Sequence, residues 1–451
     1  MKTSIKKLIA LILVFAMCLL VGCGETKNNN NSSNGGESTA DNGEYLITKG
    51  DLGAGLKVKN LKNKKITIMG AADLNALAKF DRPNAPYTAY QMCLTWKETY
   101  GVEVESLSLT SSDLIAAYAA DNMPDIISPN LGDIRNVAMD LKGKGILEDE
   151  LFFPQYNEMF KWAGLETYMV GTKQLQRHYI IFNETRFINE GQKTPLEWYK
   201  EGKWTFTQFR KTAKAMTNAA NDQYGFTGNE LNGAQSPYAA CKWDEKGRLT
   251  LDLKNEKFIT FMTEIGKLSW EDKSRRRDNK SNNWREEFPN GNDAMLIANE
   301  YEFSEICRKA KLKGGNDFGI APMFVSDVTG ETRPFYQTSS MGGFISAKCK
   351  NLEGAIEFLR IEAYVNRQMN EKLGLFNSAE QYLTKDEREA LVESLNDTIS
   401  TRPLYSISEK ASSLIQGAEN GAFSTTGITA SLDTVANQLK QEVDEYNSKI
   451  K

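Results

Sequence analysis

The chain has 451 residues, of which 40% are hydrophobic, 10% aromatic and 25% charged. This composition is typical of a globular protein and excludes a disordered or fibrous chain. Lys and Arg number 55 and Asp and Glu 59, so the formal net charge of -4 gives no overall preference for nucleic acid. The only histidine, His178, excludes metal sites built from several histidines. At about 150 residues per domain, two or three domains are expected.

The first 22 residues have the pattern of a signal peptide. Three lysines precede an uncharged, almost wholly apolar run, residues 8–21, which is shorter than the about 20 residues that a membrane-spanning helix needs. The run ends in Leu20-Val21-Gly22-Cys23, which resembles a bacterial lipobox, where the cysteine becomes the lipidated start of the mature chain. We therefore expect residues 1–22 to be removed and Cys23 to anchor the body to the extracytoplasmic face of the cell membrane.

Residues 23–44 are expected to form a flexible linker. They include four consecutive asparagines, followed by Ser, Gly and Thr. So few apolar side chains cannot be buried in a core, and the stretch is therefore typical of a tether.

Four cysteines remain in the body of the chain, and they are far apart without a CxxC motif. They are Cys93, Cys241, Cys307 and Cys349. This spacing suggests neither a zinc site nor a redox pair, and we expect no metal or cofactor. The sequence leaves two alternatives open, either two disulfides or four free thiols, because a body of this size needs no cross-links.

The next part of the chain alternates strands and helices. The patterns predict a strand at 65–69, a helix at 89–100, a strand at 102–104, a helix at 114–120 and a strand at 126–128. Ser112 or Asp113 is the expected N-cap of the second helix. This order favours an α/β domain with a mostly parallel sheet.

Ligands bind beyond the carboxyl ends of the strands in such sheets. Asp73 follows the first predicted strand, and Asn130 and Asp133 follow the third. These three side chains are therefore candidate ligand contacts. The alternative for the two aspartates, and similarly for Asn130, is that they cap the helices that follow.

The second half of the chain continues the alternation. Strands are predicted at 179–183, 224–227, 318–322 and 341–346, and helices at 208–216, after Asn351 and at 431–446. Thr207 and Asn351 are the expected N-caps.

Five stretches occur in an order that points to one family. They are the lipobox with its linker; 114–128; 180–183 followed by 203–209; 288–295; and 318–322 with 342–347. Together they resemble the extracellular solute-binding proteins of bacterial ABC transporters, in the group that binds sugars and oligosaccharides. The chain departs from the family's pattern at Phe182, where Tyr is usual, and at Tyr301, where Trp is frequent. The run 274–277 and the insert near 281–284 match nothing in the family.

The resemblance implies an α/β, two-lobe periplasmic-binding-protein-like fold, each lobe a mostly parallel sheet with flanking helices and a ligand cleft between the lobes. The chain would cross between lobes near 182–185 and 321–324. The first lobe would comprise 45–182 plus 325–375, and the second 185–320 plus 376–451. The expected function is non-enzymatic: a monomer captures a sugar or oligosaccharide and delivers it to an ABC permease, with no nucleic acid as partner.

Sugar recognition needs flat aromatic faces and planar polar groups. The aromatic candidates are Tyr301, where the family places a stacking aromatic, and Tyr336, Trp243 and Trp284. The polar candidates in this part of the chain are Gln176 and His178, which precede a predicted crossing strand, and Gln235. Trp96, Trp162 and Trp204 are expected in the core, and the basic run Arg275–Arg277 is expected to be a solvated surface loop.

Two other functions stay open on the sequence alone. A glycoside-active enzyme would need two carboxylates about 5–5.5 Å or 6.5–9.5 Å apart across a cleft. Asp and Glu are plentiful at 59, so spacing alone excludes nothing, but no catalytic signature is recognisable. A ligand-sensing subunit would use the same fold to report to a signalling partner.

Overall fold

The computed structural model describes twelve stretches between residues 59 and 448. They are 59–70, 89–129, 133–160, 164–175, 177–228, 241–244, 248–276, 288–313, 315–337, 342–400, 408–424 and 427–448. Cys23 and the expected signal peptide and linker lie outside these residues. Within the described stretches, no helix combines the length and the apolar character needed to cross a bilayer.

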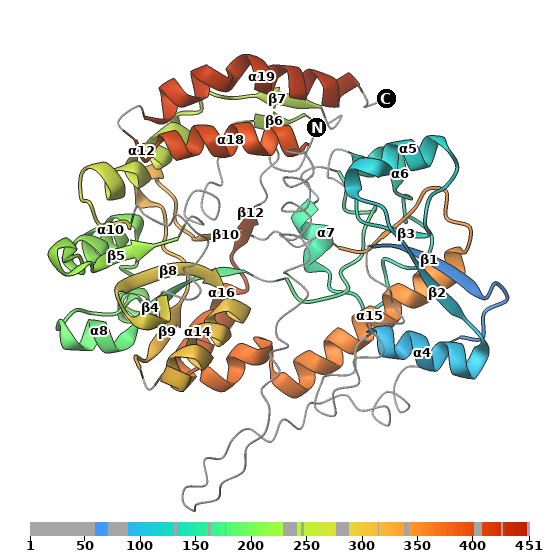
Figure 1. The fold of residues 1–451 in the computed structure, drawn as a ribbon, viewed down its shortest axis with the longest axis horizontal. Coiled ribbons are helices and arrows are strands. Elements are labelled where there is room, and N and C mark those ends of the chain that lie inside the picture. Colours follow the sequence, from blue (N-terminus) through green and yellow to red (C-terminus); the bar gives the residue numbers. More distant parts are fainter. Residues whose placement is uncertain are drawn as a thin grey trace, which may run out of the picture. The chain divides into compact units, whose positions relative to one another are not determined.

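The first sheet has four strands in the order β11-β3-β1-β2, of which Figure 1 labels β1, β2 and β3. Its strands are β1 (Lys65–Met69), β2 (Glu103–Leu107), β3 (Ile126–Ile127) and β11 (Phe344–Ile345). β1 is parallel to both β2 and β3, and β11 is antiparallel to β3. The late strand β11 therefore completes a sheet that is otherwise built from the start of the chain.

Two apolar clusters cover this sheet. One joins Ile66 of β1 to Trp96 of α4 (Ala89–Tyr100) and Leu359 of α15 (Leu352–Leu373). The other contains Leu114 of α5 (Leu114–Ala119), Ile134 of α6 (Ile134–Val137) and Tyr156 of α7 (Gln155–Phe160). Trp96 is fully buried, as predicted. We call the described residues of 59–175 and 342–365 the first lobe.

A buried carboxylate, that of Asp125, ties three segments of the first lobe together. Its Oδ2 accepts hydrogen bonds from the backbone N and the Oγ1 of Thr67, at 2.8 and 2.9 Å. Its Oδ1 accepts from the backbone N of Lys350 at 2.8 Å and of Asn351 at 3.0 Å, and from Sγ of Cys349 at 3.3 Å. The stretch that ends Met123-Pro124-Asp125 thus connects β1 to the turn before α15.

The second sheet has the order β5-β8-β4-β9, with β4 (His178–Asn183), β5 (Tyr224–Thr227), β8 (Asp293–Asn299) and β9 (Phe318–Ala321). β4 is antiparallel to both β8 and β9, and only β5 and β8 run parallel. This sheet is therefore mixed. The predicted boundary that placed residues up to 182 in the first lobe is wrong for β4, since its partners all come from later in the chain.

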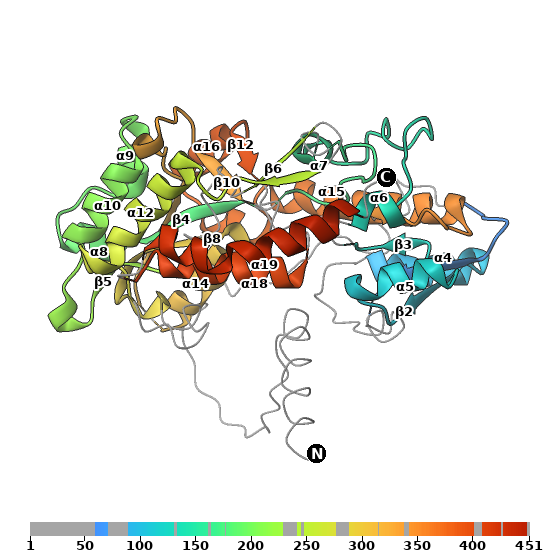
Figure 2. The same ribbon diagram turned by 90° about the horizontal axis from the view of Figure 1, so that it is seen from above.

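Helices surround the second sheet and form the second lobe together with it. They are α8 (Glu184–Asn189), α9 (Pro195–Lys200), α10 (Phe206–Ala215), α12 (Glu256–Trp270), α14 (Glu300–Lys313), α16 (Lys385–Ser394), α18 (Glu409–Gly421) and α19 (Ile428–Ser448). α18 and α19 lie side by side in both views (Figures 1 and 2). The hairpin of β6 (Cys241–Trp243) and β7 (Leu249–Leu251) is held to α19 by two hydrogen bonds between Leu249 and Asn447.

The predicted helix caps are partly correct. Asn351 caps α15 through a hydrogen bond from the N of Gly354 at 3.0 Å, as expected. α10 starts earlier than predicted, and Thr205 rather than Thr207 accepts from the N of Gln208. Neither Ser112 nor Asp113 caps α5. The Asp113 carboxylate instead accepts from the N of Thr110 at 2.7 Å, in a short 3₁₀ turn, η1 (Ser111–Asp113), before the helix.

The apolar core of the second lobe, called the second core below, is rich in aromatic side chains. Phe206 and Phe209 of α10 pack against Phe324 with ring centroids 5.4 and 4.8 Å apart. Trp204 joins the same group and is buried, as predicted. Trp162 lies outside the described residues.

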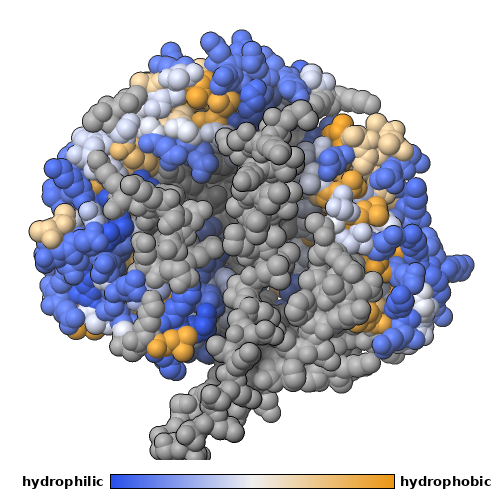
Figure 3. All heavy atoms as spheres, viewed as in Figure 1, coloured by the Kyte–Doolittle hydropathy of each residue, from blue (hydrophilic) through white to orange (hydrophobic). Residues whose placement is uncertain are grey.

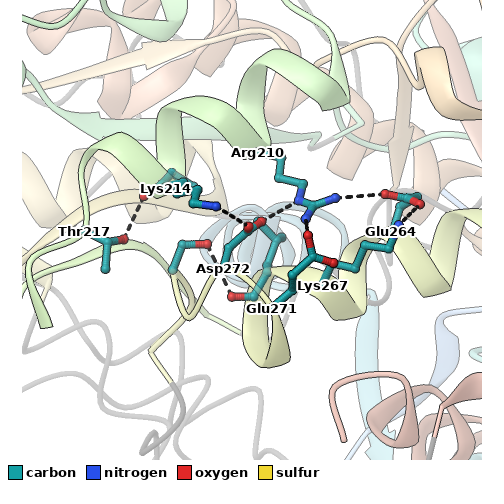
Figure 4. Close-up of polar contacts among 10 residues, drawn as sticks. Arg210, Lys214, Thr217, Glu264, Lys267, Glu271 and Asp272 are labelled. Carbon is teal, nitrogen blue, oxygen red and sulfur yellow. Dashed lines mark hydrogen bonds and ion pairs between the residues drawn. The ribbon is translucent and has the colours of Figure 1, made fainter. Parts of the chain in front are cut away.

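Salt bridges link α10 to the end of α12 (Figure 4). Arg210 of α10 pairs with Glu264 at 3.1 Å, with Glu271 at 2.7 Å and with Asp272. Lys214, one turn further along α10, also reaches Asp272 at 3.2 Å. Burial alone would raise the pKa of Asp272, but the hydrogen bonds and charges of Arg210 and Lys214 outweigh it and lower that pKa.

The chain passes between the two cores at positions other than those predicted. Leu175 belongs to the first-lobe core, whereas Arg177 already contacts the end of α16. On the way back, Val325 pairs with Thr205 and Pro334. The strand β10 (Phe335–Gln337) pairs with β12 (Thr398–Ser400), so residues 325–337 belong to the second lobe. The crossings predicted at 182–185 and 321–324 therefore both lie within the second lobe, and a further connection runs from α15 to Phe376.

The expectation of a solvated basic loop is wrong for Arg275 and Arg276, which are both buried. Arg276 pairs with Asp293 at 2.9 Å and with Asp222 at 2.8 Å. Arg275 lies over the ring of Phe423, 3.8 Å from its centroid. Arg277 lies outside the described residues. Since the anionic partners come from distant parts of the chain, the local sequence gave no sign of this burial.

Three cysteines are described with their side chains, and all three are free thiols: Cys93, Cys307 and Cys349. Cys93 is buried, and desolvation raises its pKa. Of Cys241 the structure describes only the backbone, in β6.

Candidate functional site

Five of the ten predicted ligand contacts lie outside the described residues: Asp73, Asn130, Gln176, Gln235 and Trp284. Trp243 is described only as a backbone position in β6, opposite Leu249. The remaining four are Asp133, His178, Tyr301 and Tyr336.

Tyr301 stands in the first turn of α14, directly after the buried strand β8. Asn299 and Glu302 form a reciprocal cap: the N of Glu302 donates to Asn299 Oδ1 at 2.9 Å, and the N of Asn299 donates to Glu302 Oε2 at 3.2 Å. This cap fixes the backbone on both sides of Tyr301. The Tyr301 side chain is 51% exposed, so its ring can meet a ligand.

Glu300, next to Tyr301, is an acidic residue whose side chain is buried. Among the described residues, its Oε2 has no hydrogen-bond partner. Desolvation raises the pKa of this carboxyl to about 7, although hydrogen bonds from the backbone of Glu300 itself and of Arg177 oppose the shift.

His178 is close to this turn. It opens β4, and its register partner in β8 is Asn299. Two of the predicted residues, His178 and Tyr301, therefore lie at the same end of the two central strands of the second sheet. His178 is half-buried.

Tyr336 is not available to a ligand in this structure, since its side chain is fully buried in the second core. Its hydroxyl accepts a hydrogen bond from the N of Met323 at 3.1 Å. Its ring packs edge-on against Tyr179, 5.7 Å between centroids. The prediction of a ligand contact here is wrong, because the neighbouring strand pairing of β10 with β12 turns the residue into the core.

Asp133 lies in the first lobe at the start of α6 and is partly exposed. Its side chain makes no capping hydrogen bond to that helix, so the structural alternative of an N-cap is not realised. A ligand contact by Asp133 stays a prediction.

Arg177 is an important residue that the sequence analysis missed. Its guanidinium is buried and donates to the carbonyl oxygens of Ser394 and Leu395, both at 2.7 Å, and of Asp397 at 3.4 Å. Carbonyls at the end of a helix have no partner within the helix, so Arg177 satisfies the open end of α16. Its position beside Gln176 and His178 was a weak signal, because an arginine before a strand is usually solvated.

The exposed Tyr301 and the half-buried His178 offer the kinds of group that bind a neutral polar ligand. An exposed aromatic ring offers a face for the C–H surface of a sugar, and the nearby histidine offers polar atoms. Among the described residues, no group of three or more potential metal ligands occurs. On the face of the molecule seen in Figure 1, Figure 3 shows hydrophilic side chains over most of the described surface, with hydrophobic residues in small separate groups.

Comparison with protein-family models gave no match. Comparison with curated proteins also gave none. Solved structures, in contrast, match over most of the chain. A Listeria monocytogenes ABC substrate-binding protein in complex with cycloalternan has a TM-score of 0.57 at 15% identity, covering 85% of this chain and 98% of its own.

Two further structures match equally well. A cyclo/maltodextrin-binding protein complexed with maltotetraose has a TM-score of 0.57 at 14% identity, with 86% of this chain and 99% of its own covered. The sugar-binding protein MalE from Xanthomonas citri has a TM-score of 0.59 at 12% identity, with 85% and 98% covered. The chain therefore has the two-lobe α/β fold of the sugar-binding proteins that serve ABC transporters.

Proposed function

We propose that this protein captures a sugar or oligosaccharide between its two lobes and hands it to an ABC permease. The observation that carries the proposal is the agreement of fold, over most of the chain, with structures that are described as sugar-binding. The exposed ring of Tyr301 at the end of β8 supports it, because an aromatic face is the usual platform for a sugar ring.

Binding and release need no chemical step on the ligand. Closure of two lobes around a solute is a hinge motion, and the closed form presents a surface for the permease. We propose that the protein is a monomeric carrier rather than a glycoside-active enzyme or a sensor. A sensor would use the same fold and bind the same ligand, so the protein partner distinguishes a sensor from a carrier.

The experiment is a thermal-shift screen of the purified body with glucose, maltose, maltotetraose and a cyclic glucan. A ligand at 100 times its Kd is expected to stabilise the protein by about 2.7 kcal/mol. Chromatography of the same mixtures after prolonged incubation then distinguishes carrier from enzyme. A stabilising sugar that stays intact supports the proposal, and turnover of that sugar contradicts it.

We further propose that Cys23 is lipidated and holds the protein at the extracytoplasmic face of the membrane. The lipobox-like sequence and the polar linker after it motivate this proposal. A single acyl chain binds membranes only marginally, whereas several anchor a protein stably. The Cys23→Ala variant is expected to leave the membrane fraction or to keep its first 22 residues. Unchanged processing and anchoring of that variant would contradict the proposal.

Truncation of Tyr301 tests the stacking role directly. Tyr301→Ala is expected to weaken binding of the sugar found in the screen by roughly 5- to 150-fold, from a loss of about 1–3 kcal/mol. Tyr301→Phe and Tyr301→Trp are expected to keep most of the affinity, because the ring face rather than the hydroxyl makes the contact. Titration calorimetry measures all three.

The unliganded melting temperature separates this role from a structural one. Tyr301 is 51% exposed, so its truncation is expected to leave the melting temperature almost unchanged. Ile188→Ala, at another exposed apolar position in the second lobe, is the matched control and should keep full affinity. Parent-like binding by Tyr301→Ala would rule out stacking.

A further inference from the structure

The chain enters the first lobe through a lysine-rich segment, residues 59–65, which we call the lysine bend. It contains four lysines and no acidic residue. Among the described residues, the lysine bend is the nearest along the chain to Cys23, which Lys59 follows by 36 residues. The segment, drawn in blue, lies at the outer edge of the first lobe in both views (Figures 1 and 2). Anchoring at Cys23 would therefore bring this part of the described body to a membrane first.

Contacts with two helices hold the backbone of the lysine bend. Leu61 is buried in the core of the first lobe. The carbonyl of Lys59 accepts a hydrogen bond from Nε1 of Trp96 in α4 at 2.9 Å, and the N of Lys59 donates to Glu357 of α15 at 3.3 Å. The bend is thus fixed to the lobe, and a force on its lysines acts on the whole lobe.

The lysines in and beside the bend differ in whether an acidic side chain neutralises them. Lys65 pairs with Glu105 at 2.6 Å, and Lys97 of α4 pairs with Glu103 at 2.9 Å. The other lysines of the bend form no ion pair with the described residues and are exposed or half-buried: Lys59, Lys62 and Lys64. The Nζ of Lys64 contacts the side-chain oxygen of Asn60, which is a neutral partner. Three positive charges therefore remain unmatched on a short, fixed stretch of surface.

We propose that Lys59, Lys62 and Lys64 form a contact surface for the anionic lipid headgroups of the membrane that holds the protein. An anionic surface strengthens binding roughly fivefold for each nearby lysine, so three lysines contribute roughly 150-fold. The whole chain has a formal net charge of -4, so the attraction is local to the bend and orients the lobe. This inference rests on the proposed anchoring at Cys23, which supplies the membrane but not the orientation.

The position of the bend in the sheet is compatible with ligand binding. Lys65 opens β1, so the bend lies at the amino end of that strand. Since β1 runs parallel to β2 and β3, ligands are expected beyond the opposite, carboxyl ends of these strands. A coil of 36 residues spans roughly 30–36 Å, so an anchor and the bend can meet the same membrane surface. Contact through the bend would leave the carboxyl ends of the strands uncovered.

Vesicle flotation measures this contact without the lipid anchor. The chain from residue 23 onward, carrying Cys23→Ala, is mixed with vesicles of phosphatidylcholine alone or with an equal part of phosphatidylglycerol. We expect binding to the anionic vesicles at low salt, and loss of that binding in 1 M salt, where the Debye length is about 3 Å. The triple variant K59Q, K62Q, K64Q is expected to bind the anionic vesicles roughly 150-fold more weakly.

A second triple variant controls for the change in total charge. K211Q, K254Q, K440Q removes three exposed lysines of the second lobe, and it should bind the anionic vesicles as the parent does. Absence of binding by the parent, equal binding to both kinds of vesicle, or equal losses in the two triple variants would overturn the proposal. Because the tested chain carries no lipid, failure here is distinct from failure of Cys23 to be lipidated.

Discussion

Replacing Asp125 by alanine is expected to lower the free energy of unfolding by about 3–5 kcal/mol. The Asp125 carboxylate accepts five hydrogen bonds, three of them from backbone N–H groups of Thr67, Lys350 and Asn351. Truncation leaves these donors without a partner in a buried site, and each such loss costs about 1–3 kcal/mol, less than additively. Urea unfolding at pH 7 measures the change.

The pH dependence gives a second test of the same carboxylate. Burial alone would raise the pKa of Asp125, but the hydrogen bonds from Thr67, Cys349 and Lys350 outweigh it and lower that pKa. A carboxyl with a lowered pKa contributes stability above its ordinary pKa of 3.8, and this stability is lost as the pH falls through the lowered value. The difference in the free energy of unfolding between Asp125→Ala and the parent should therefore be smaller in strong acid than at pH 7.

Asp113→Ala is the matched control, because its carboxylate also accepts backbone and hydroxyl hydrogen bonds but lies in an exposed turn. It is expected to cost about 1 kcal/mol, as for an exposed cap. A loss below about 1 kcal/mol in Asp125→Ala would show that the carboxylate does not hold the three segments together.

Replacing Arg177 by methionine is expected to cost about 3–5 kcal/mol. Methionine fills much of the space but donates nothing, so the carbonyls of Ser394 and Leu395 lose their donor in a buried setting. The cation–π contact with Tyr336, 5.2 Å from the guanidinium to the ring centroid, is lost as well. Thermal and urea unfolding of the unliganded protein measure the loss.

An exposed arginine in the same lobe provides the comparison. Arg388 of α16 pairs with Glu380 at the surface, where an ion pair contributes about 0–1 kcal/mol. Arg388→Met is therefore expected to change stability by less than about 1 kcal/mol. Equal losses in the two variants would contradict the structural role assigned to Arg177.

The local elements were largely predictable from the sequence. The strand at 65–69 and the helix at 89–100 are found at those residues, because alternation, apolar spacing and the glycine at 101 mark them within the chain. The resemblance to sugar-binding proteins also led to the correct fold. Cap positions were harder: Thr205 was overlooked for Thr207, since both threonines precede apolar helical residues and only the pairing of Thr205 with Val325 fixes where the helix begins.

What depends on distant partners could not be predicted. Arg276 is buried because Asp222 and Asp293 meet it across the second lobe, and nothing near Arg276 in sequence signals that encounter. Tyr336 enters the core because β10 finds β12 from much later in the chain. Burial of Glu300 reflects the same limit, since an acidic residue after a strand is ordinarily solvated. Tyr301 is exposed, as a stacking role requires, and that role stays a prediction.

The route of the chain also has a consequence for synthesis and folding. The first sheet lacks β11, and its helical cover lacks α15, until residues 344–373 have been made. The second core is complete only with Leu439 and Val443 of α19. The first lobe can therefore not finish folding before residue 373 has been made, and the second lobe must wait for the last helix. A nascent chain that stops at Gln337 holds two unfinished cores, so at that length neither lobe is a complete folding unit.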